Sequence, residues 1–187
     1  GTNMSIYINT DNGVTFNGVS SVTTADVVAS NGIVHIVDSV IGLPTVVTFA
    51  VADPNFEILV QALTRDDLTM DFVGLLNSST SPPTPLTVFA PVNNAFVNLL
   101  DELGLNGLND IDEPTLSAVL TYHVVTGANQ LSINLSDGME FTTAGGGALL
   151  FNFGDNGEGI LTDNNGRTSN IVAVDVQANN GIIHAID

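Results

Sequence analysis

The feature that most constrains the fold of this chain is a segment that occurs twice. Residues 26–38, DVVASNGIVHIVD, match residues 175–187, DVQANNGIIHAID, at eight of thirteen positions, and a constant 149 residues separates the two. A looser match relates residues 6–18 to residues 150–166, where a strand-like stretch, an Asp-Asn-Gly turn and a second strand-like stretch follow each other. Because a repeated segment marks a repeated structural unit, we expect the ends of the chain not to coincide with unit boundaries.

The residues between the two copies divide into a helical first half and a β-rich second half. Pro, Asp or Asn at helix-start positions, followed by apolar residues at helical spacing, predicts helices in 52–63, 70–76, 93–100 and 112–123, the third of them capped near Asn93 or Asn94. The apolar run 86–89 reads as a strand, and from Gln130 onward the pattern has period two with turns at SDG, GGG, DNG and NNG. This order predicts an α+β fold.

Three sequence motifs, in order, are similar to those of one known family. They are LTVFAPVNNAF (86–96), YHVV (122–125) and NGIIHAID (180–187), and the last occurs again in NGIVHIVDSVIGLP (31–44). With these motifs the chain resembles the fasciclin (FAS1) domain family. The resemblance implies helices from the first half packed on an antiparallel β-meander or wedge, with the first and last motifs side by side in the core.

The repeat and the resemblance together predict the division into domains. Residues 1–43 read as the C-terminal, β-rich part of one FAS1 repeat, residues 44–46 as a linker, and residues 47–187 as a FAS1 domain without its closing strand. The strand SVIGLP follows the first copy of the motif but not the second. Residues 1–43 are too few to bury a core alone, so their helical half has to come from elsewhere. Two sources stay open: a longer tandem array, or strand addition between chains.

The motif residues are expected to be structural. They are Thr87, Phe89, Ala90, Pro91, Asn94, Phe96, Asn31, Gly32, His35, Asp38, Asn180, Gly181, His184 and Asp187. His35 and His184 lie among apolar residues in predicted strands, which favours buried, hydrogen-bonded histidines over catalytic or metal-binding ones.

Contact candidates lie elsewhere in the chain. The resemblance implies an adhesive role for Tyr122 and His123, although core packing explains them as well. The uncharged loop 76–86 is a second candidate because proline stiffens it and it should be exposed; its contact residues would be Ser78, Ser79, Thr80, Pro82 and Pro83.

Metal binding and catalysis have little support in the residues. Asp155, Glu158 and Asp163 supply oxygen atoms that could bind calcium, yet their spacing matches neither an EF-hand nor an RTX repeat, and hairpin turns account for them without a metal. No nucleophile elbow or zinc-type histidine pair occurs. We therefore expect no cofactor and no enzymatic activity, with a hydrolase as a remote alternative.

Composition restricts the partners. Two Lys+Arg against twenty Asp+Glu give a net charge of −18, which repels nucleic acid, and no apolar run is long enough to span a membrane. The resemblance implies an extracellular, secreted or cell-surface adhesion or matrix module. Its expected partners are other copies or neighbouring FAS1 repeats and cell-surface or matrix proteins and glycans. The alternative is a soluble module that binds a polysaccharide or small ligand in an aromatic-lined groove.

Overall fold

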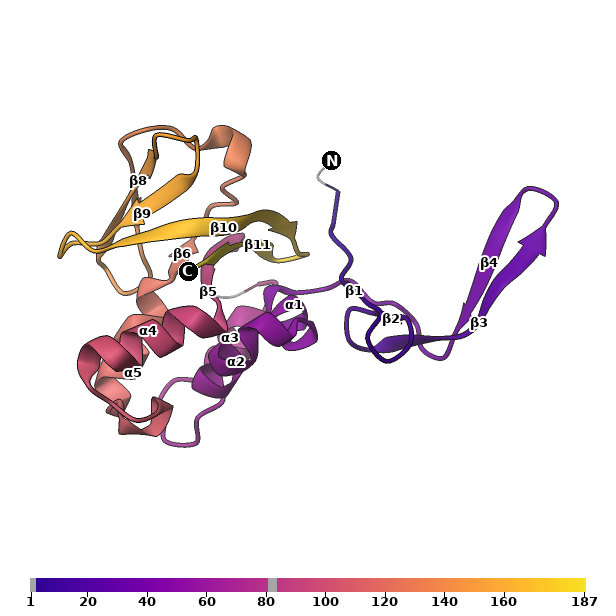
Figure 1. The fold of residues 1–187 in the computed structure, drawn as a ribbon, viewed down its shortest axis with the longest axis horizontal. Coiled ribbons are helices and arrows are strands. Elements are labelled where there is room, and N and C mark those ends of the chain that lie inside the picture. The colour runs from indigo at the N-terminus through magenta and orange to yellow at the C-terminus, as the bar shows by residue number, and fades with distance from the viewer. Residues whose placement is uncertain (1–2, 81–83) are drawn as a thin grey trace.

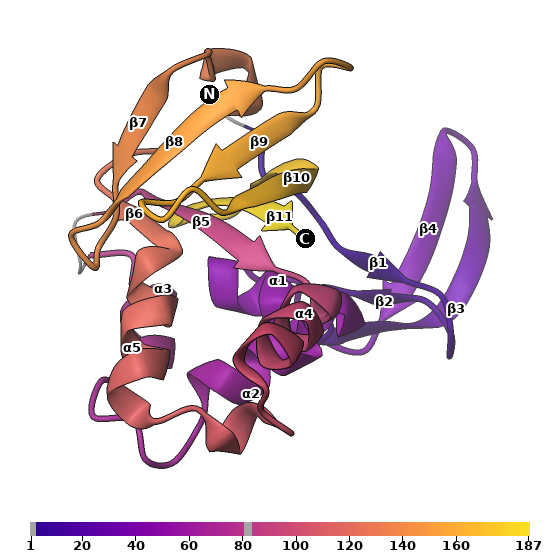
Figure 2. The ribbon, with the colours of Figure 1, turned by 60° about the vertical axis from the view of Figure 1, so that its left-hand side comes forward.

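The computed structural model describes residues 3–80 and 84–187, which form two sheets and a layer of helices (Figure 1). The first sheet is antiparallel and has the order β1-β2-β3-β4. Its strands are β1 (Ile8–Asn9), β2 (Thr15–Phe16), β3 (Ser20–Ala29) and β4 (Gly32–Val37). The β3–β4 hairpin projects away from the rest of the chain in both views (Figures 1 and 2).

The helical layer follows at once. It contains α1 (Val46–Ala52), α2 (Glu57–Leu63), α3 (Phe72–Asn77), α4 (Asn93–Leu103), α5 (Glu113–Tyr122) and the short 3-10 helices η1 (Pro54–Phe56) and η2 (Leu108–Asp110). A further 3-10 helix, η3 (Ser132–Asn134), lies between β6 and β7 in the sequence. The predicted helix starts are confirmed at Asp53, whose carboxylate accepts from Asn55 N, and at Asp112, which accepts from Thr115 N.

Helix α1 lies outside the predicted helices. The predicted linker 44–46 leads directly into it: Pro44 is buried, and Thr45 caps α1 through a reciprocal pair of hydrogen bonds with Thr48. The β-branched residues of α1 gave no helical signal. Its cap and the burial of Val46 and Phe49 stabilise the helix instead.

The second sheet has seven strands in the order β6-β5-β11-β10-β9-β8-β7. They are β5 (Leu86–Pro91), β6 (Val124–Thr126), β7 (Met139–Thr142), β8 (Ala148–Phe153), β9 (Gly159–Thr162), β10 (Thr168–Gln177) and β11 (Gly181–Ile186). Neighbours are antiparallel, except that β11 lies parallel to β5, with Gly181 opposite Leu86 and Ile186 opposite Pro91. The predicted antiparallel meander is confirmed from β7 to β11, and its last strand inserts between β5 and β10, parallel to β5.

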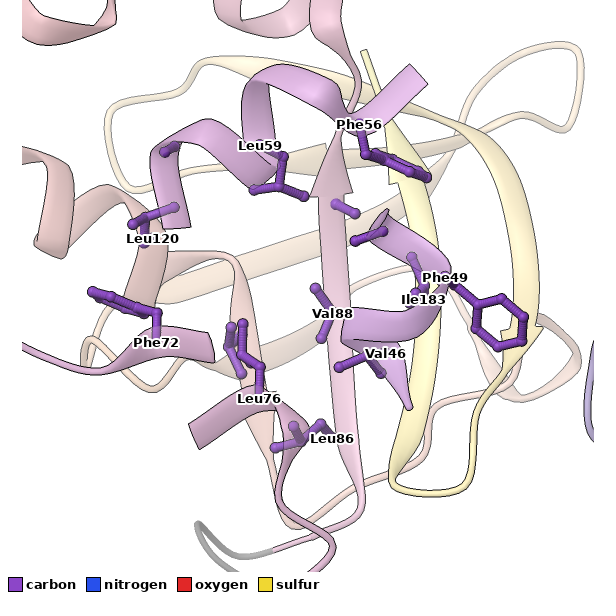
Figure 3. Close-up of a cluster of buried hydrophobic side chains, with 14 of the residues drawn as sticks. Val46, Phe49, Phe56, Leu59, Phe72, Leu76, Leu86, Val88, Leu120 and Ile183 are labelled. Carbon is purple, nitrogen blue, oxygen red and sulfur yellow. The ribbon is translucent and has the colours of Figure 1, made fainter. Parts of the chain in front are cut away.

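The sheet separates two hydrophobic clusters. The larger lies on the helical side, where side chains of α1, α2, α3 and α5 meet Val88 of β5 and Ile183 of β11 (Figure 3). The smaller contains Phe89 and Ile186 with residues of β7, β8 and β9. Because successive side chains of β5 and β11 enter different clusters, both strands are buried throughout. The α+β prediction is confirmed.

Two residues of the segment before α1, Ser5 and Tyr7, contact the seven-stranded sheet and the larger hydrophobic cluster. Ser5 N donates to Gln177 O at 2.9 Å, Gln177 N donates to Ser5 Oγ at 3.0 Å, and Tyr7 packs against the larger cluster. The sheet edge at β4 has no such cover: Ile33 is 61% exposed, whereas Ile182, its counterpart 149 residues later, is 0% exposed. Matched residues thus occupy opposite environments.

This pair makes a controlled test of where the core lies. We expect Ile182→Ala to lower the free energy of unfolding by about 2–5 kcal/mol, because it removes methyl groups from a filled core. Ile33→Ala should change it by about 0.5 kcal/mol or less, as at other exposed positions. Urea titration followed by circular dichroism measures both values. Equal losses in the two variants would contradict the burial described above.

Candidate binding surfaces

The three sequence motifs meet at one place in the fold. Strands β5 and β11 pair along their whole length, as the resemblance implied for the first and last motifs. The middle motif joins them through its backbone, since Phe89 N donates to His123 O at 2.9 Å. At the far end Val92 N donates to Ile186 O at 2.9 Å. The motifs therefore build the centre of the sheet and the base of α4 and α5.

A groove of about 560 Å³ opens beside this junction, between α4, α5 and the strands β9 to β11. Its apolar lining residues are Phe89, Pro91, Ala95, Phe96, Leu99, Ala118, Val119, Leu149, Leu161 and Ile186. Its polar rim consists of Asp163, Asn164, Asn165, Arg167, Thr168, Ser169 and Asp187. Tyr122 and His123 line it as well. The volume lies in the range of small-molecule sites.

Tyr122 is held by the backbone around it. Its hydroxyl donates a hydrogen bond to Ala148 O and accepts one from Asn164 N at 3.4 Å, so it is used both as a donor and as an acceptor. A Cβ atom at Gly147 would lie 2.3 Å from the Tyr122 ring, so only glycine permits this contact. The ring therefore fixes the turn after β7 against α5, and its hydroxyl is committed to backbone groups.

His123 ends α5 and turns its ring back onto the helix. Its Nδ1 lies 2.7 Å from Val119 O, so this nitrogen carries the proton and donates. Burial lowers the pKa of His123, and the bond to Val119 opposes that shift only in part. The ring is therefore neutral at pH 7.

His184 is the fully buried histidine of the closing segment. Its ring stacks on Phe89 at a centroid distance of 5.7 Å, and Nε2 lies 2.7 Å from Gln130 O, while Nδ1 has no partner. Burial lowers its pKa, against the smaller opposing effects of Gln130 and Asp175. The expectation of a buried, bonded histidine holds in the structure for His184.

The same expectation is wrong for His35. Its side chain is 46% exposed, because β4 is the edge strand of its sheet in the described part of the chain. Nδ1 accepts from Asp26 N at 3.3 Å, and the Asp26 carboxylate lies 4.0 Å away. Local sequence thus sets the hairpin geometry around this ring, whereas its burial depends on segments far away in the chain.

The asparagine and aspartate of the closing segment fix its two ends. Asn180 is buried and bridges three elements: its Oδ1 accepts from Val46 N, and its Nδ2 donates to Leu76 O and Ser78 O. At the other end the Asp187 carboxylate accepts from the backbone N and side-chain Nδ2 of Asn170, both at 2.7 Å.

The first copy repeats only the second of these arrangements. Asp38 Oδ1 accepts from Ser21 N at 2.8 Å, as Asp187 does from the equivalent Asn170. Asn31, the counterpart of Asn180, is exposed, and so is Gly32 beside it. The contacts that depend only on the hairpin are therefore kept.

The remaining residues of the first motif are structural in their placement. Thr87, Phe89, Ala90, Pro91 and Phe96 are all buried. The Thr87 hydroxyl donates to Ala128 O at 2.8 Å and accepts from Gln130 N at 3.0 Å, which ties β5 to the segment after β6.

The predicted cap of α4 near Asn93 or Asn94 is wrong. No side chain caps this helix, and Asn94 is exposed. The Asn93 side chain instead accepts from Ile58 N and donates to Pro54 O, so it holds η1 and α2 against α4. A tertiary contact replaces the local one.

The proline-containing loop is described in part. Ser78 is half-buried and its carbonyl is bound by Asn180, while Ser79 and Thr80 are exposed. Pro82 and Pro83 lie outside the described residues. Of the five predicted contact residues of this loop, Ser79 and Thr80 are described and exposed.

The acidic turn residues do not form an ion site. Glu158 accepts from Asn156 N, and the Asp163 carboxylate accepts from Asn165 N and from the backbone and side chain of Arg167. Within residues 3–80 and 84–187, no cluster of three or more His, Asp or Glu could hold a metal. The calcium alternative at Asp155, Glu158 and Asp163 gains no support.

Both cations of the chain are used internally. Arg65 binds Asp67 and the carbonyls of Leu108 and Ile111, and it lowers the pKa of Asp67. On the groove rim Arg167 binds Asp163 at 2.8 Å, which raises the pKa of the guanidinium. The surface therefore offers an anionic partner little attraction.

None of the helices in the described segments is both long and apolar enough to cross a membrane by itself. Val46–Ala52 and Pro54–Leu63 meet the length and composition only as a pair, across a bend of 99°.

The arrangement of sheet, helical layer and central parallel strand pair defines a FAS1-type α+β fold. The model of the fasciclin domain matches residues 1–44 and 54–187, and the chain belongs to this family. At the level of the family this supports an adhesion- or matrix-type module.

Individual relatives agree with the assignment. Uncharacterized protein sll1735 of Synechocystis is 34% identical over 149 residues, which cover 78% of this chain and 96% of that protein. Mouse stabilin-2 is 25% identical over 98% of this chain, and the matched part makes up only 8% of the length of stabilin-2. The solved FAS1 domain pair of the insect cell adhesion molecule fasciclin I has the same fold, with a TM-score of 0.61 and 22% identity. It covers 97% of this chain and 65% of that one.

Buried neutral histidines make stability depend on pH. The pKa values of His123 and His184 lie below the ordinary 6.5, so the unfolded chain binds more protons as the pH falls below about 6.5. Stability is therefore fully present above that pH and declines below it, by up to about 1.4 kcal/mol per pH unit for each histidine. Urea titrations between pH 7.5 and 5.5 measure the slope.

Single substitutions show which histidine causes the change of unfolding free energy with pH. We expect His184→Asn to be less stable than the parent at pH 7.5 and to show a smaller further loss at pH 5.5. His35→Asn, at the matched exposed position, serves as the control. Identical slopes in the two variants would contradict the role given to His184.

Proposed function

We propose that this chain is part of an extracellular or cell-surface adhesion or matrix module that acts by recognition of proteins or glycans and not by catalysis. One observation carries the proposal: the chain holds two copies of the closing hairpin, on two separate sheets. Material from two FAS1 units in one chain means several binding surfaces on one molecule. Linked surfaces bind a repetitive partner far more strongly than one surface does.

In this proposal the chain contains parts of two FAS1 units. Residues 1–43 form the β-rich closing part of one unit, and residues 47–187 form a second unit. The units work in a tandem or self-assembling array, in which head-to-tail contacts that do not close extend into filaments.

The chemistry of the described side chains fits recognition. His123 and His184 each direct a ring nitrogen at a backbone carbonyl, which leaves them positioned as structural donors. With both arginines paired internally and a net charge of −18, nucleic acid and anionic membranes are poor partners. Neutral glycans and polypeptides without strong negative charge fit the surface better.

Adhesion assays test this proposal. Beads coated with the chain should clump with each other, or be retained on collagen or dextran, with a dependence on coating density steeper than linear. Retention on heparin should stay at the level of albumin-coated surfaces. Ser79→Arg with Thr80→Arg should reduce retention if the loop makes contact, whereas Ser136→Arg, an exposed serine elsewhere, serves as the control. Beads that neither clump nor bind any surface above albumin would contradict adhesion.

A second candidate function rests on the groove. Its size suits a small ligand, and most of its lining is aliphatic: Phe89 and Phe96 are buried, and Tyr122 is a half-buried aromatic residue of the lining. A neutral aliphatic molecule fits this lining better than a polysaccharide.

This candidate predicts stabilisation by such a molecule. 1-Decanol should raise the thermal midpoint of the chain in a saturable manner, because a ligand that binds the folded state shifts unfolding. Ala95→Trp would fill the groove and abolish the shift, while Ala144→Trp, at an exposed site away from the groove, should keep it. A shift that survives Ala95→Trp would show binding elsewhere.

A further inference from the structure

The chain contains seven Asn-Gly pairs, which begin at Asn12, Asn17, Asn31, Asn106, Asn156, Asn165 and Asn180. In such a pair the glycine nitrogen can attack Cγ of the asparagine side chain, because glycine has no Cβ atom to hinder the approach. The bond from Cγ to Nδ2 breaks, ammonia leaves with the glycine amide proton, and a five-membered imide remains. Water then opens the imide at either carbonyl and gives aspartate or isoaspartate. No cofactor or oxidant is needed, so the fold decides which pair reacts.

Two of these asparagines are buried and bound. The Asn180 side chain accepts from Val46 N and donates to two carbonyls at the end of α3. Asn17 is 4% exposed, and its Oδ1 accepts from Tyr7 N at 2.9 Å. Neither side chain can turn toward the following amide until these hydrogen bonds open. The folded state therefore protects both pairs.

Four other pairs have an exposed asparagine but a glycine whose backbone is held. Gly157 N and Gly166 N each donate to the carbonyl three residues earlier in a tight turn, at 2.9 Å and 3.0 Å. Gly13 and Gly32 take part in β-bridges, which restrict the movement of their backbones. In each of these pairs the attack has to work against an existing backbone contact.

The pair Asn106-Gly107 differs from the other six. It lies in the connection between α4 and α5, and Asn106 is exposed. Within the described residues, neither the Asn106 side chain nor Gly107 N has a hydrogen-bond partner. Gly107 is extended, with φ −173°, and apart from its chain neighbours nothing lies within 4 Å of where its Cβ would be. Both reacting groups are thus free in the folded protein.

We propose that Asn106 is a site of spontaneous deamidation, at which the folded protein forms isoaspartate and aspartate faster than at its six other Asn-Gly pairs. Each event replaces a neutral amide by a carboxylate, so the chain becomes more negative than the −18 given by its residues. The reaction uses groups of this connection alone, and the inference does not depend on the proposed function.

The modification loosens the connection in which it occurs. Asn106 N donates to Asp110 Oδ2 at 3.0 Å, and Asp110 N donates to Gly107 O at 3.0 Å, so contacts on both sides of the reacting bond hold η2. A carboxylate at position 106 is repelled by Asp110, and isoaspartate adds one carbon to the main chain between them. Arg65 still binds two carbonyls of η2 and the residue after it, which keeps the change local.

Incubation of the intact chain in mildly alkaline buffer tests the inference. Mass spectrometry of proteolytic peptides should show deamidation at Asn106 about tenfold faster than at Asn165 and about 100-fold faster than at Asn180, because bonds at the latter two must open first. Protein isoaspartyl methyltransferase should label the peptide that contains Asn106. A rate at Asn106 no higher than at Asn165 or Asn180 would overturn the inference.

Gly107→Ala is the matched variant. Its Cβ fits without a clash, because position 107 is extended and open, yet it hinders the approach of the nitrogen to Cγ. We expect labelling at Asn106 to fall by about tenfold, with an unchanged thermal midpoint and circular dichroism spectrum. Undiminished labelling in this folded variant would show that the reaction does not pass through the imide, and the assignment would fail.

Urea separates the effect of the fold from that of the local sequence. Asn106 and Asn180 are each followed by glycine and an aliphatic residue, so the two should react at similar rates in the unfolded chain. An undiminished excess at Asn106 in urea would mean that the structure does not select this site. In the aged native protein, hydrogen exchange should be faster at the amides of η2 and unchanged in β11. Unchanged exchange in η2 would contradict the loosening.

Discussion

The fold depends on the parallel pairing of β5 with β11. This pairing joins the first motif to the closing segment almost a hundred residues later and gives both strands neighbours on each side. Side chains then alternate between two clusters: Val88 and Ile183 face the helices, while Phe89 and Ile186 face the β-meander. The approach is possible because position 181 is glycine. The groove and the buried histidines lie where these strands end or meet the middle motif, residues 122–125.

Local sequence predicted the elements that local interactions stabilise. The starts of η1 and α5 were visible because Asp53 and Asp112 cap their own backbone, and the hairpin turns were visible because Asn-Gly and Asp-Gly tolerate positive φ. Helix α1 was missed, since a run of valine and threonine favours a strand until burial and a capping box intervene. The parallel placement of β11 could not be read from periodicity, because a strand buried on both faces shows none.

The residues of the candidate site were predictable where a sequence motif contains them and not elsewhere. The motifs located Tyr122, His123 and His184, and the structure brings them to one junction of sheet and helices. The rim of the groove left no signal in the sequence: Asn164 and Arg167 reach it from the turn between β9 and β10, and Ser169 reaches it from the start of β10. The difference between His35 and His184 shows most clearly what local sequence cannot predict, namely the burial of a side chain. Nearly identical segments form the same hairpin, yet one ring is buried and the other exposed, because burial is decided by distant strands.

The charge of the chain bears on what an uncovered hairpin can do. Exposed strand edges and apolar faces invite edge-to-edge association, which proteins commonly oppose with charge. Here β3 and β4 carry one acidic residue, Asp26, and no basic one, so the hairpin has little protection of its own. The repulsion must come from the net charge of the whole molecule, which acts between like chains and is screened by salt. It opposes indiscriminate self-association, whereas contacts between linked units benefit from a high effective concentration and can overcome it.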